Sequence, residues 1–321
     1  MTNDSPRPRA ARLHAHGKPL VVEDVDLPAP GEDDVVVEMA FAGVNPVDRY
    51  VADGRVAPDG PLPRTLGSEG AGHVVGDGRP VLVQGRGLGA RRNGVWAEQV
   101  TVPRATLTDI PAGVDLAEAA AMGVAGSTAW RTATEQARVT ADDRVLVLGA
   151  SGGVGSILVS LCHSLGARVW GQTGNSDKAA FVAEQGAEEV VTAAAGGLAA
   201  AVEPLAPTVV FDALGAGFTA AAVEALAPFG RLISFGVSAG ATTELNMQSL
   251  YRKGLTVYGY GGMIEPEERM AAGKAAALAA LADGRLRVVV AARLPLTRVN
   301  DAFAALVDRT VTGKLVLDLG R

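Results

Sequence analysis

The chain has 321 residues, of which 48% are apolar and 20% charged, and its formal net charge is −6. This length suffices for a sizeable buried core and, at roughly 150 residues per domain, predicts two domains. The acidic balance and the lack of a basic stripe argue against nucleic acid as a partner. The single cysteine, Cys162, excludes an intrachain disulfide and a cysteine-rich zinc site.

The sequence also gives no sign of a membrane segment. No apolar run reaches the roughly 18 residues that a membrane helix needs. The start, Met1 to Arg12, is polar and interrupted by prolines, without the apolar core of a signal peptide. We therefore expect a cytoplasmic protein with no membrane partner.

The first hundred residues predict a β domain. Short strands are expected between proline and glycine clusters at Leu20–Val22, Val35–Met39, Val74–Val75, Val81–Gln84 and Ala97–Val102. Beyond them, Asp115 and Glu118 form a capping-box pattern, which predicts an alanine-rich helix running to about Thr134.

From Arg144 onward, strand and helix patterns alternate, which predicts a parallel sheet with helices on both faces. Strands are expected at Arg144–Leu148, Arg168–Gln172, Glu189–Val191, Val209–Phe211, Arg231–Phe235 and Thr256–Tyr258. Helices are expected at Val154–Leu165, Lys178–Gln185, Phe218–Leu226, Pro266–Asp283 and Asn300–Arg309, before a closing strand at Lys314–Leu317.

A dinucleotide-binding fingerprint follows the first of these strands. In the stretch LVLGASGGVG, Ala150, Gly152 and Gly155 take its three glycine places. Gly152 lets the backbone approach a pyrophosphate, Gly155 lets the helix pack on the sheet, and the helix amides point at the phosphates. Strand, turn, helix and next strand occur in order, so we predict nucleotide binding rather than a plain structural turn. The predicted contacts are Ser151, Gly152, Gly153 and Val154.

The end of the next strand indicates which nucleotide binds. An NAD site places an acidic residue there to hold the ribose hydroxyls. The stretch after Gln172 instead offers Gly174, Asn175, Ser176 and Lys178, and the cation suits a 2′-phosphate. Asp177 is assigned to a helix N-terminus. We predict NADPH over NADH; the alternative is an ordinary polar helix cap.

Several stretches together resemble the zinc-free medium-chain dehydrogenase/reductase superfamily, in its quinone oxidoreductase (zeta-crystallin-like) branch. They are GVNPVDRY at 43–50, LPRTLGSEGAG at 62–72, the fingerprint at 150–155 and GKLVL at 313–317. The resemblance runs in order from about Ala10 to Leu319, which makes it far more specific than any one motif.

The resemblance implies an α/β fold with two domains. A GroES-like, partly open β-barrel catalytic domain is expected over residues 1–122, and a Rossmann, doubly wound parallel-sheet NADPH-binding domain over 123–262. The segment 263–321 is expected to complete the catalytic domain. The resemblance further implies a cleft between the domains for nicotinamide and acceptor, and a homodimer formed through edge strands of the nucleotide domain.

A catalytic metal is not expected. The zinc members of the family carry Cys where this chain has Asn45 and His where it has Ser68, so only Glu69 is left of that set. One carboxylate without a Cys or His partner does not hold catalytic Zn²⁺. The prediction is therefore a metal-free site.

The resemblance implies hydride transfer from the nicotinamide C4 of NADPH to a quinone or another conjugated carbonyl compound. Asn45 and Tyr50 are the candidate catalytic residues. Asn45 offers an amide hydrogen bond to the acceptor carbonyl or the nicotinamide ribose, and Tyr50 offers a phenolic hydrogen bond and a proton. The alternatives are that Asn45 fixes a turn and that Tyr50 only walls the nicotinamide.

Further cofactor contacts are expected along the nicotinamide half. They are Thr128, Phe235, Gly236, Val237, Gly259, Tyr260, Gly261 and Lys314. For Thr128 the alternative is a hydroxyl that bonds its own helix backbone, and for Lys314 it is a surface lysine at a strand start. The arginine-bearing loop at 85–94 is interpreted as a solvated turn rather than a site for acidic or phosphorylated acceptors.

Three functions stay open at this point. The first is an NADPH-dependent quinone oxidoreductase. The second is an enoyl reductase acting on an α,β-unsaturated ketone or thioester in a biosynthetic pathway, which the expected lining residues do not separate from the first. The third is a non-catalytic NADPH-binding protein, against which the intact cofactor motifs and the hydrogen-bond donors count.

Overall fold

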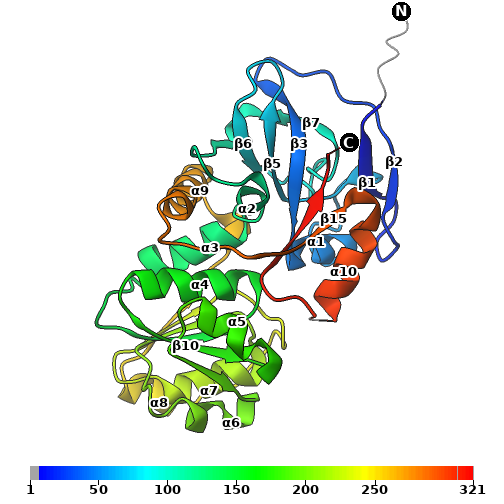
Figure 1. The fold of residues 1–321 in the computed structure, drawn as a ribbon. Coiled ribbons are helices and arrows are strands. Elements are labelled where there is room, and N and C mark those ends of the chain that lie inside the picture. Colours follow the sequence, from blue (N-terminus) through cyan, green and yellow to red (C-terminus); the bar gives the residue numbers. More distant parts are fainter. Residues whose placement is uncertain (1–6, 309, 321) are drawn as a thin grey trace, which may run out of the picture. The chain divides into compact units, whose positions relative to one another are not determined.

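The computed structural model describes residues 7–308 and 310–320, and the chain divides into two compact units (Figure 1). The first unit comprises the chain up to Val124 together with Glu267–Ala282 and the residues from Val289 onward. The second unit comprises Ala125–Pro266 and Asp283–Val288. The expected boundaries at 122/123 and 262/263 compare with divisions at 124/125 and 266/267, whereas Asp283–Val288, expected in the catalytic domain, lies in the second unit.

The first unit is built on a mostly antiparallel sheet. Its strand order is β15-β16-β3-β5-β6-β8, with β7 also paired to β3. The bounds are β15 Val290–Pro295, β16 Lys314–Asp318, β3 Asp34–Val44, β5 Glu69–Val74, β6 Pro80–Gln84, β8 Leu107–Asp109 and β7 Gln99–Pro103. In Figure 1 the C-terminal strand β16, in red, lies beside the long strand β3, in blue.

Smaller elements complete this unit. A second sheet has the order β2-β1-β4, with bounds β2 Val21–Asp24, β1 Arg9–Leu13 and β4 Arg64–Thr65. The helices are α1 Pro46–Ala52, α2 Leu116–Ala120, α9 Glu267–Ala282 and α10 Val299–Val307. The core includes Trp96, which is fully buried and whose indole lies 5.5 Å from the ring of Phe303 on α10. The unit therefore joins N-terminal and C-terminal segments in one core.

The second unit contains the parallel sheet that the sequence predicts. Its order is β11-β10-β9-β12-β13-β14, and each pairing is parallel. The strands are β9 Arg144–Leu148, β10 Arg168–Thr173, β11 Glu189–Thr192, β12 Val209–Asp212, β13 Arg231–Ser234 and β14 Thr256–Gly259. Strand order reverses between β9 and β12, and ligands of such sheets bind at the carboxyl ends beside this point.

Helices cover this sheet. They are α3 Ala125–Arg131, α4 Gly153–Ser164, α5 Ala179–Glu184, α6 Ala195–Ala201, α7 Ala216–Ala225 and α8 Met247–Arg252. Cys162 on α4 is fully buried, and burial raises the pKa of its thiol. Among the described residues, no helix is both long and apolar enough to cross a bilayer.

One expected helix is wrong in its extent. Asp115 does cap a helix, because its carboxylate accepts the amides of Ala117 and Glu118 at 2.9 and 3.2 Å. The helix α2 ends at Ala120, however, and α3 begins only at Ala125. The amide of Val124 donates at 2.6 Å to Oε2 of Glu69. In a continuous helix this amide would instead donate to a backbone carbonyl. The sequence between them therefore forms turns.

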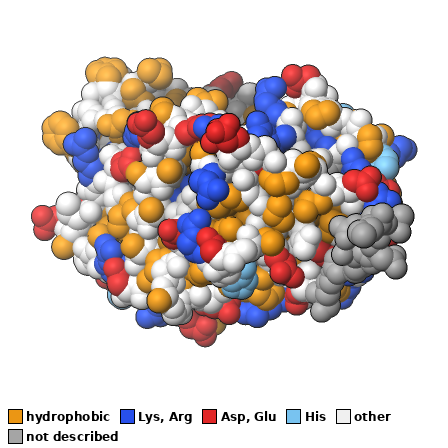
Figure 2. Space-filling model, turned by 90° about the horizontal axis from the view of Figure 1, so that it is seen from above, with side chains coloured by type: hydrophobic (Ala, Val, Ile, Leu, Met, Phe, Trp, Pro, Cys, Tyr) orange, Lys and Arg blue, Asp and Glu red, His pale blue; other side chains and the backbone are white. Residues whose placement is uncertain are grey.

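Charged side chains of both signs are mixed on the surface. On the face shown in Figure 2, acidic and basic groups lie among one another without a continuous basic area. Among the described residues, many of these charges form exposed pairs, such as Arg168 with Glu188 and Arg285 with Asp283. Pairs of this kind contribute little stability each.

Candidate functional site

The predicted nucleotide fingerprint forms a tight turn between β9 and α4. A Cβ at Gly155 would lie 2.3 Å from the carbonyl oxygen of Gly149, so only glycine lets the helix start so close to the strand. At Gly152 such a Cβ would lie 3.3 Å from the same carbonyl oxygen of Gly149, a tight contact, so this position also has little room for a side chain. The predicted contacts Ser151–Val154 all lie in this turn and in the first turn of α4. A helix start of this kind presents free amides to an anion.

Gln172 at the end of β10 holds this turn in place, and the sequence analysis missed it. Its side chain is 1% exposed. Oε1 accepts the amide of Gly149 at 3.1 Å, and Nε2 donates to the carbonyl of Ala193 at 2.9 Å. It thus ties the chain after β9 to the chain after β11. A polar residue at the end of an otherwise buried strand is the sequence signal that could have indicated it.

The residues expected to choose between NADH and NADPH follow β10. Gly174, Asn175 and Ser176 are exposed, and Lys178 is half-buried. The Asn175 side chain accepts the amide of Asp177 at 2.8 Å and caps the short helix Ser176–Lys178. Asp177 therefore lies in the first turn of a helix, as expected. The residues from Gly174 to Ser176, ahead of Asp177, include no carboxylate.

Asp212 organises the next loop and was also missed. It is fully buried at the end of β12. Its carboxylate accepts the amides of Leu214 and Gly215 at 2.8 and 3.0 Å and the hydroxyl of Thr219 at 2.5 Å. This fixes the loop that lies beside the predicted segment 235–237 after β13, because the Phe235 amide donates to the Asp212 carbonyl at 3.0 Å.

The structure brings two further predicted residues together. The side chains of Thr128 and Tyr260 share a hydrogen bond, and burial raises the pKa of the Tyr260 phenol. The guanidinium of Arg131 lies 5.7 Å from the Tyr260 ring centroid and pairs with Glu135 and Glu265, each at 3.1 Å. This network fixes the end of β14 and the segment after it, which carry the predicted residues 259–261.

In the first unit, a polar cluster is buried where β3, β5 and β16 meet. Lys314, Asn45 and Glu69 are 3%, 3% and 0% exposed. The ammonium of Lys314 donates to Oδ1 of Asn45 at 2.5 Å and to Oε1 of Glu69 at 3.0 Å. Nδ2 of Asn45 also donates to Oε1 of Glu69, at 2.6 Å. The alternative that Lys314 is a surface residue is therefore wrong.

Asp48 joins the two turns that carry this cluster. One carboxylate oxygen accepts the amide of Asn45 at 2.9 Å, and the other accepts the amide of Ser68 at 3.0 Å. Burial raises the pKa of Asp48 to about 7, and the nearby Glu69 adds to this rise. Asp48 thus fixes the start of α1 to the start of β5. The sequence analysis did not single it out.

The second catalytic candidate, Tyr50, lies on α1 five residues after Asn45 and is half-buried. The guanidinium of Arg55 lies 4.3 Å from its ring centroid. The short helix α1 therefore carries both candidates, with Asn45 at its N-cap.

The donor set of this cluster does not fit a catalytic zinc ion. The oxygens of Asn45 and Glu69 that could face a cation both bind the Lys314 ammonium. The described residues contain no group of three His, Cys, Asp or Glu side chains that could hold a metal. Catalytic zinc is bound by three protein ligands, with His, Cys and carboxylates as donors.

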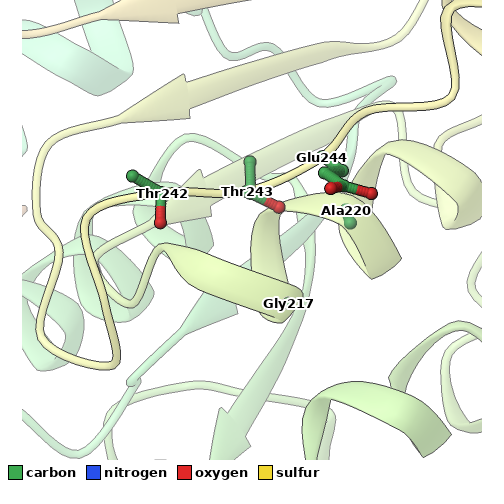
Figure 3. Close-up of a pocket in the computed structure, with 5 residues that line it drawn as sticks. All are labelled: Gly217, Ala220, Thr242, Thr243 and Glu244. Atoms are coloured by element: carbon green, nitrogen blue, oxygen red, sulfur yellow. The ribbon is translucent and has the colours of Figure 1, made fainter.

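Figure 3 shows an open hollow elsewhere in the second unit. It is lined by Gly217 and Ala220 of α7 and by Thr242, Thr243 and Glu244 of the loop before α8. None of these residues was predicted for the site. The lining holds small side chains and one carboxylate, so we assign it no chemistry.

Comparison with known proteins connects both units to one family. A model of the alcohol dehydrogenase GroES-like domain matches residues 31–112, and a model described as zinc-binding dehydrogenase matches residues 153–280. Quinone oxidoreductase 1 of Escherichia coli is 28% identical over 322 residues, covering 95% of this chain and 98% of that protein.

Two further relatives differ in kind. A mycocerosic acid synthase-like polyketide synthase of Mycolicibacterium smegmatis is 30% identical over 321 residues, which are 94% of this chain but 15% of that protein. The solved structure of a mycobacterial protein complexed with NADPH aligns with a TM-score of 0.85 and 27% identity. That alignment covers 97% of this chain and 99% of the other.

Proposed function

The chain belongs to the medium-chain dehydrogenase/reductase superfamily, in its quinone oxidoreductase branch, and from this we propose that it transfers a hydride from NADPH to a quinone or another conjugated carbonyl compound without a catalytic metal. The buried cluster of Lys314, Asn45 and Glu69 carries the proposal. It combines a donor set unsuited to zinc with an amide that can bind an acceptor oxygen.

Binding of NADPH is supported by the second unit. The turn before α4 and the amides of the first helical turn suit a pyrophosphate, and Gln172 and Asp212 hold the neighbouring loops. Lys178 suits a 2′-phosphate. The bound nicotinamide supplies the hydride at C4.

Asn45 is proposed to bind the acceptor oxygen. Its Oδ1 binds Lys314 and one hydrogen of Nδ2 binds Glu69, so the second hydrogen of Nδ2 has no partner among the described residues. Negative charge develops on a carbonyl oxygen as hydride adds to the conjugated system. A fixed donor in a buried site stabilises that charge.

Tyr50 is proposed as a second donor from the same helix. The phenol could donate a hydrogen bond or a proton to the acceptor. The alternative is that the ring only walls the nicotinamide. Tyr50→Phe tests this: unchanged kcat with every acceptor would leave the wall as its only role.

A second candidate function is reduction of the carbon–carbon double bond of an α,β-unsaturated ketone or thioester. The similarity to a stretch of a polyketide synthase favours it. The same hydride donor and the same oxygen-binding amide serve both reactions, because each acceptor is a conjugated carbonyl compound.

Anaerobic oxidation of NADPH with matched quinones and α,β-unsaturated ketones or thioesters separates these functions. We expect oxidation with quinones and no carbon-bound deuterium when 4-deuterated NADPH is used. Deuterium on the carbon of a reduced alkene would establish the second candidate instead. NADPH binding without oxidation by any acceptor would leave the non-catalytic alternative. The same reactions with NADH in place of NADPH test the predicted preference for NADPH.

We also propose a homodimer formed through β14. This strand lies at the edge of the parallel sheet, with Val257 and Tyr258 40% and 41% exposed. The helix before it exposes Met247 and Tyr251 by 63% and 66%. An edge strand with exposed apolar side chains is a template for pairing, and a second copy of the same strand satisfies it symmetrically.

A further inference from the structure

The buried cluster of the first unit contains a positive charge that the proposed reaction has not used. The ammonium of Lys314 lies between an amide oxygen, at 2.5 Å, and a carboxylate oxygen, at 3.0 Å. Its side chain is 4% exposed and that of Glu69 is 0% exposed. Charge-assisted hydrogen bonds of this kind are roughly twice as strong as neutral ones.

The backbone places this lysine opposite Asn45. Strand β16 pairs with β3, with Leu315 opposite Val44, so Lys314 comes to lie beside the residue that follows β3. The Lys314 amide also donates to the carbonyl of Val289 at 2.9 Å. Regular strand pairing, rather than a loop, therefore fixes the backbone of Lys314 beside Asn45.

We propose that Lys314 is a positioning residue that fixes the side-chain amide of Asn45 in one orientation, with its N–H side available to the acceptor oxygen. This inference rests on the proposed function. This role differs from the predicted cofactor contact. Two hydrogens of the ammonium bind Asn45 and Glu69, so only the third would remain for the cofactor.

Lys314 and Glu69 both favour the same orientation of the Asn45 side-chain amide. An amide side chain has an acceptor end and a donor end. Turned by 180°, Asn45 would face the Lys314 ammonium with its own N–H groups and the Glu69 carboxylate with its oxygen. Two donors would then oppose each other, as would two acceptors. Lys314 and Glu69 thus select one orientation from opposite sides.

The ammonium also compensates the buried charge of Glu69. The second oxygen of that carboxylate accepts the amide of Val124 at 2.6 Å. The Lys314 ammonium therefore lies between Oδ1 of Asn45 and Oε1 of Glu69 and supplies the positive charge beside the buried carboxylate. Its charge is part of the chain, so the cluster needs no dissociable ion.

Removal of the ammonium is expected to lower kcat strongly and to change the affinity for NADPH only slightly. In Lys314→Ala, only Glu69 still orients the amide of Asn45, and the expected loss approaches that of one fixed oxyanion donor, about 10²-fold in kcat. The Kd for NADPH, followed by nicotinamide fluorescence, is expected to stay within about twofold because Lys314 acts through Asn45.

Chemical rescue tests whether the charge matters. n-Propylammonium replaces the atoms that Lys314→Ala removes, so it should restore kcat in a saturable manner. n-Propanol, which lacks the charge, and KCl at equal ionic strength should not. Lys274→Ala is the matched control: Lys274 is a buried lysine of the same unit, 2% exposed, whose ammonium donates to the Gln84 carbonyl at 2.9 Å. Its kcat should not respond to n-propylammonium.

The outcomes separate this inference from the proposed function. Wild-type kcat in Lys314→Ala, or equal rescue by n-propanol, overturns the positioning role while the proposed function stands. A wild type that reduces no acceptor overturns both. If Lys314→Ala does not fold, the double variant Lys314→Met with Glu69→Gln removes both charges together. This variant should fold and have low kcat, and wild-type kcat in it would overturn the role.

Discussion

Replacing Asp48 with asparagine tests the electrostatics of the buried cluster most directly. Asp48 is 3% exposed, accepts the amides of Asn45 and Ser68, and has a pKa raised from 3.8 to about 7. A carboxyl whose pKa is higher in the folded state binds its proton more tightly when folded. Its contribution to stability is therefore fully present below pH 4 and is lost as the pH rises to 7.

The size of this effect follows from the shift. A rise of about three pKa units corresponds to about 4 kcal/mol, at 1.36 kcal/mol for each unit. Between pH 5 and pH 7, the free energy of unfolding of the wild type should thus fall by about 2 kcal/mol from this group. Asp48→Asn does not titrate. It keeps one acceptor and turns an NH₂ group toward a backbone amide, which costs about 1–3 kcal/mol at every pH.

Urea unfolding of both proteins at pH 5, 6, 7 and 8 measures the difference. We expect Asp48→Asn to be clearly less stable than the wild type at pH 5 and to approach or exceed its stability at pH 8. Other titrating groups affect both proteins alike and cancel. Parallel pH profiles, or a wild type that gains on the variant as pH rises, would refute the reasoning.

Four further changes address the other sites. Gly155→Ala should cost about 1–3 kcal/mol of stability and weaken NADPH binding, because the added methyl group meets backbone; Gly197→Ala, where a Cβ meets nothing within 4 Å, is the control. Lys178→Gln should weaken NADPH binding about tenfold and leave NADH unchanged; equal loss for both would contradict the 2′-phosphate contact. Tyr258→Lys should convert a dimer into a monomer in light scattering; a wild-type monomer would disprove the interface. Asn45→Ala should lower kcat about 10²-fold with the Kd for NADPH unchanged.

The parallel sheet and its nucleotide turn could be predicted from the sequence because their signals are local. β9 spans the expected residues Arg144–Leu148, and the turn follows within the next few residues. The short helices α1 and α8 gave no such signal. α1 and α8 have seven and six residues, too few for a clear apolar period, and neither was expected.

Contacts between distant residues could not be predicted. The chain breaks between α2 and α3 because the amide of Val124 binds Glu69, which lies 55 residues earlier. Lys314 meets Asn45 across 269 residues, through a strand pairing that no local pattern specifies. The candidates Asn45 and Tyr50 were named from a resemblance, whereas the roles of Asp48, Gln172 and Asp212 follow from their hydrogen bonds in the structure.

The position of Cys162 has a consequence for the chemistry proposed here. Thiolates add to quinones and enones, and an exposed cysteine of low pKa would be modified covalently by these compounds during turnover. The chain has one cysteine, it is 0% exposed inside α4, and burial raises the pKa of its thiol. A protein that reduces such compounds would thus be protected from covalent inactivation at sulfur by its own substrate.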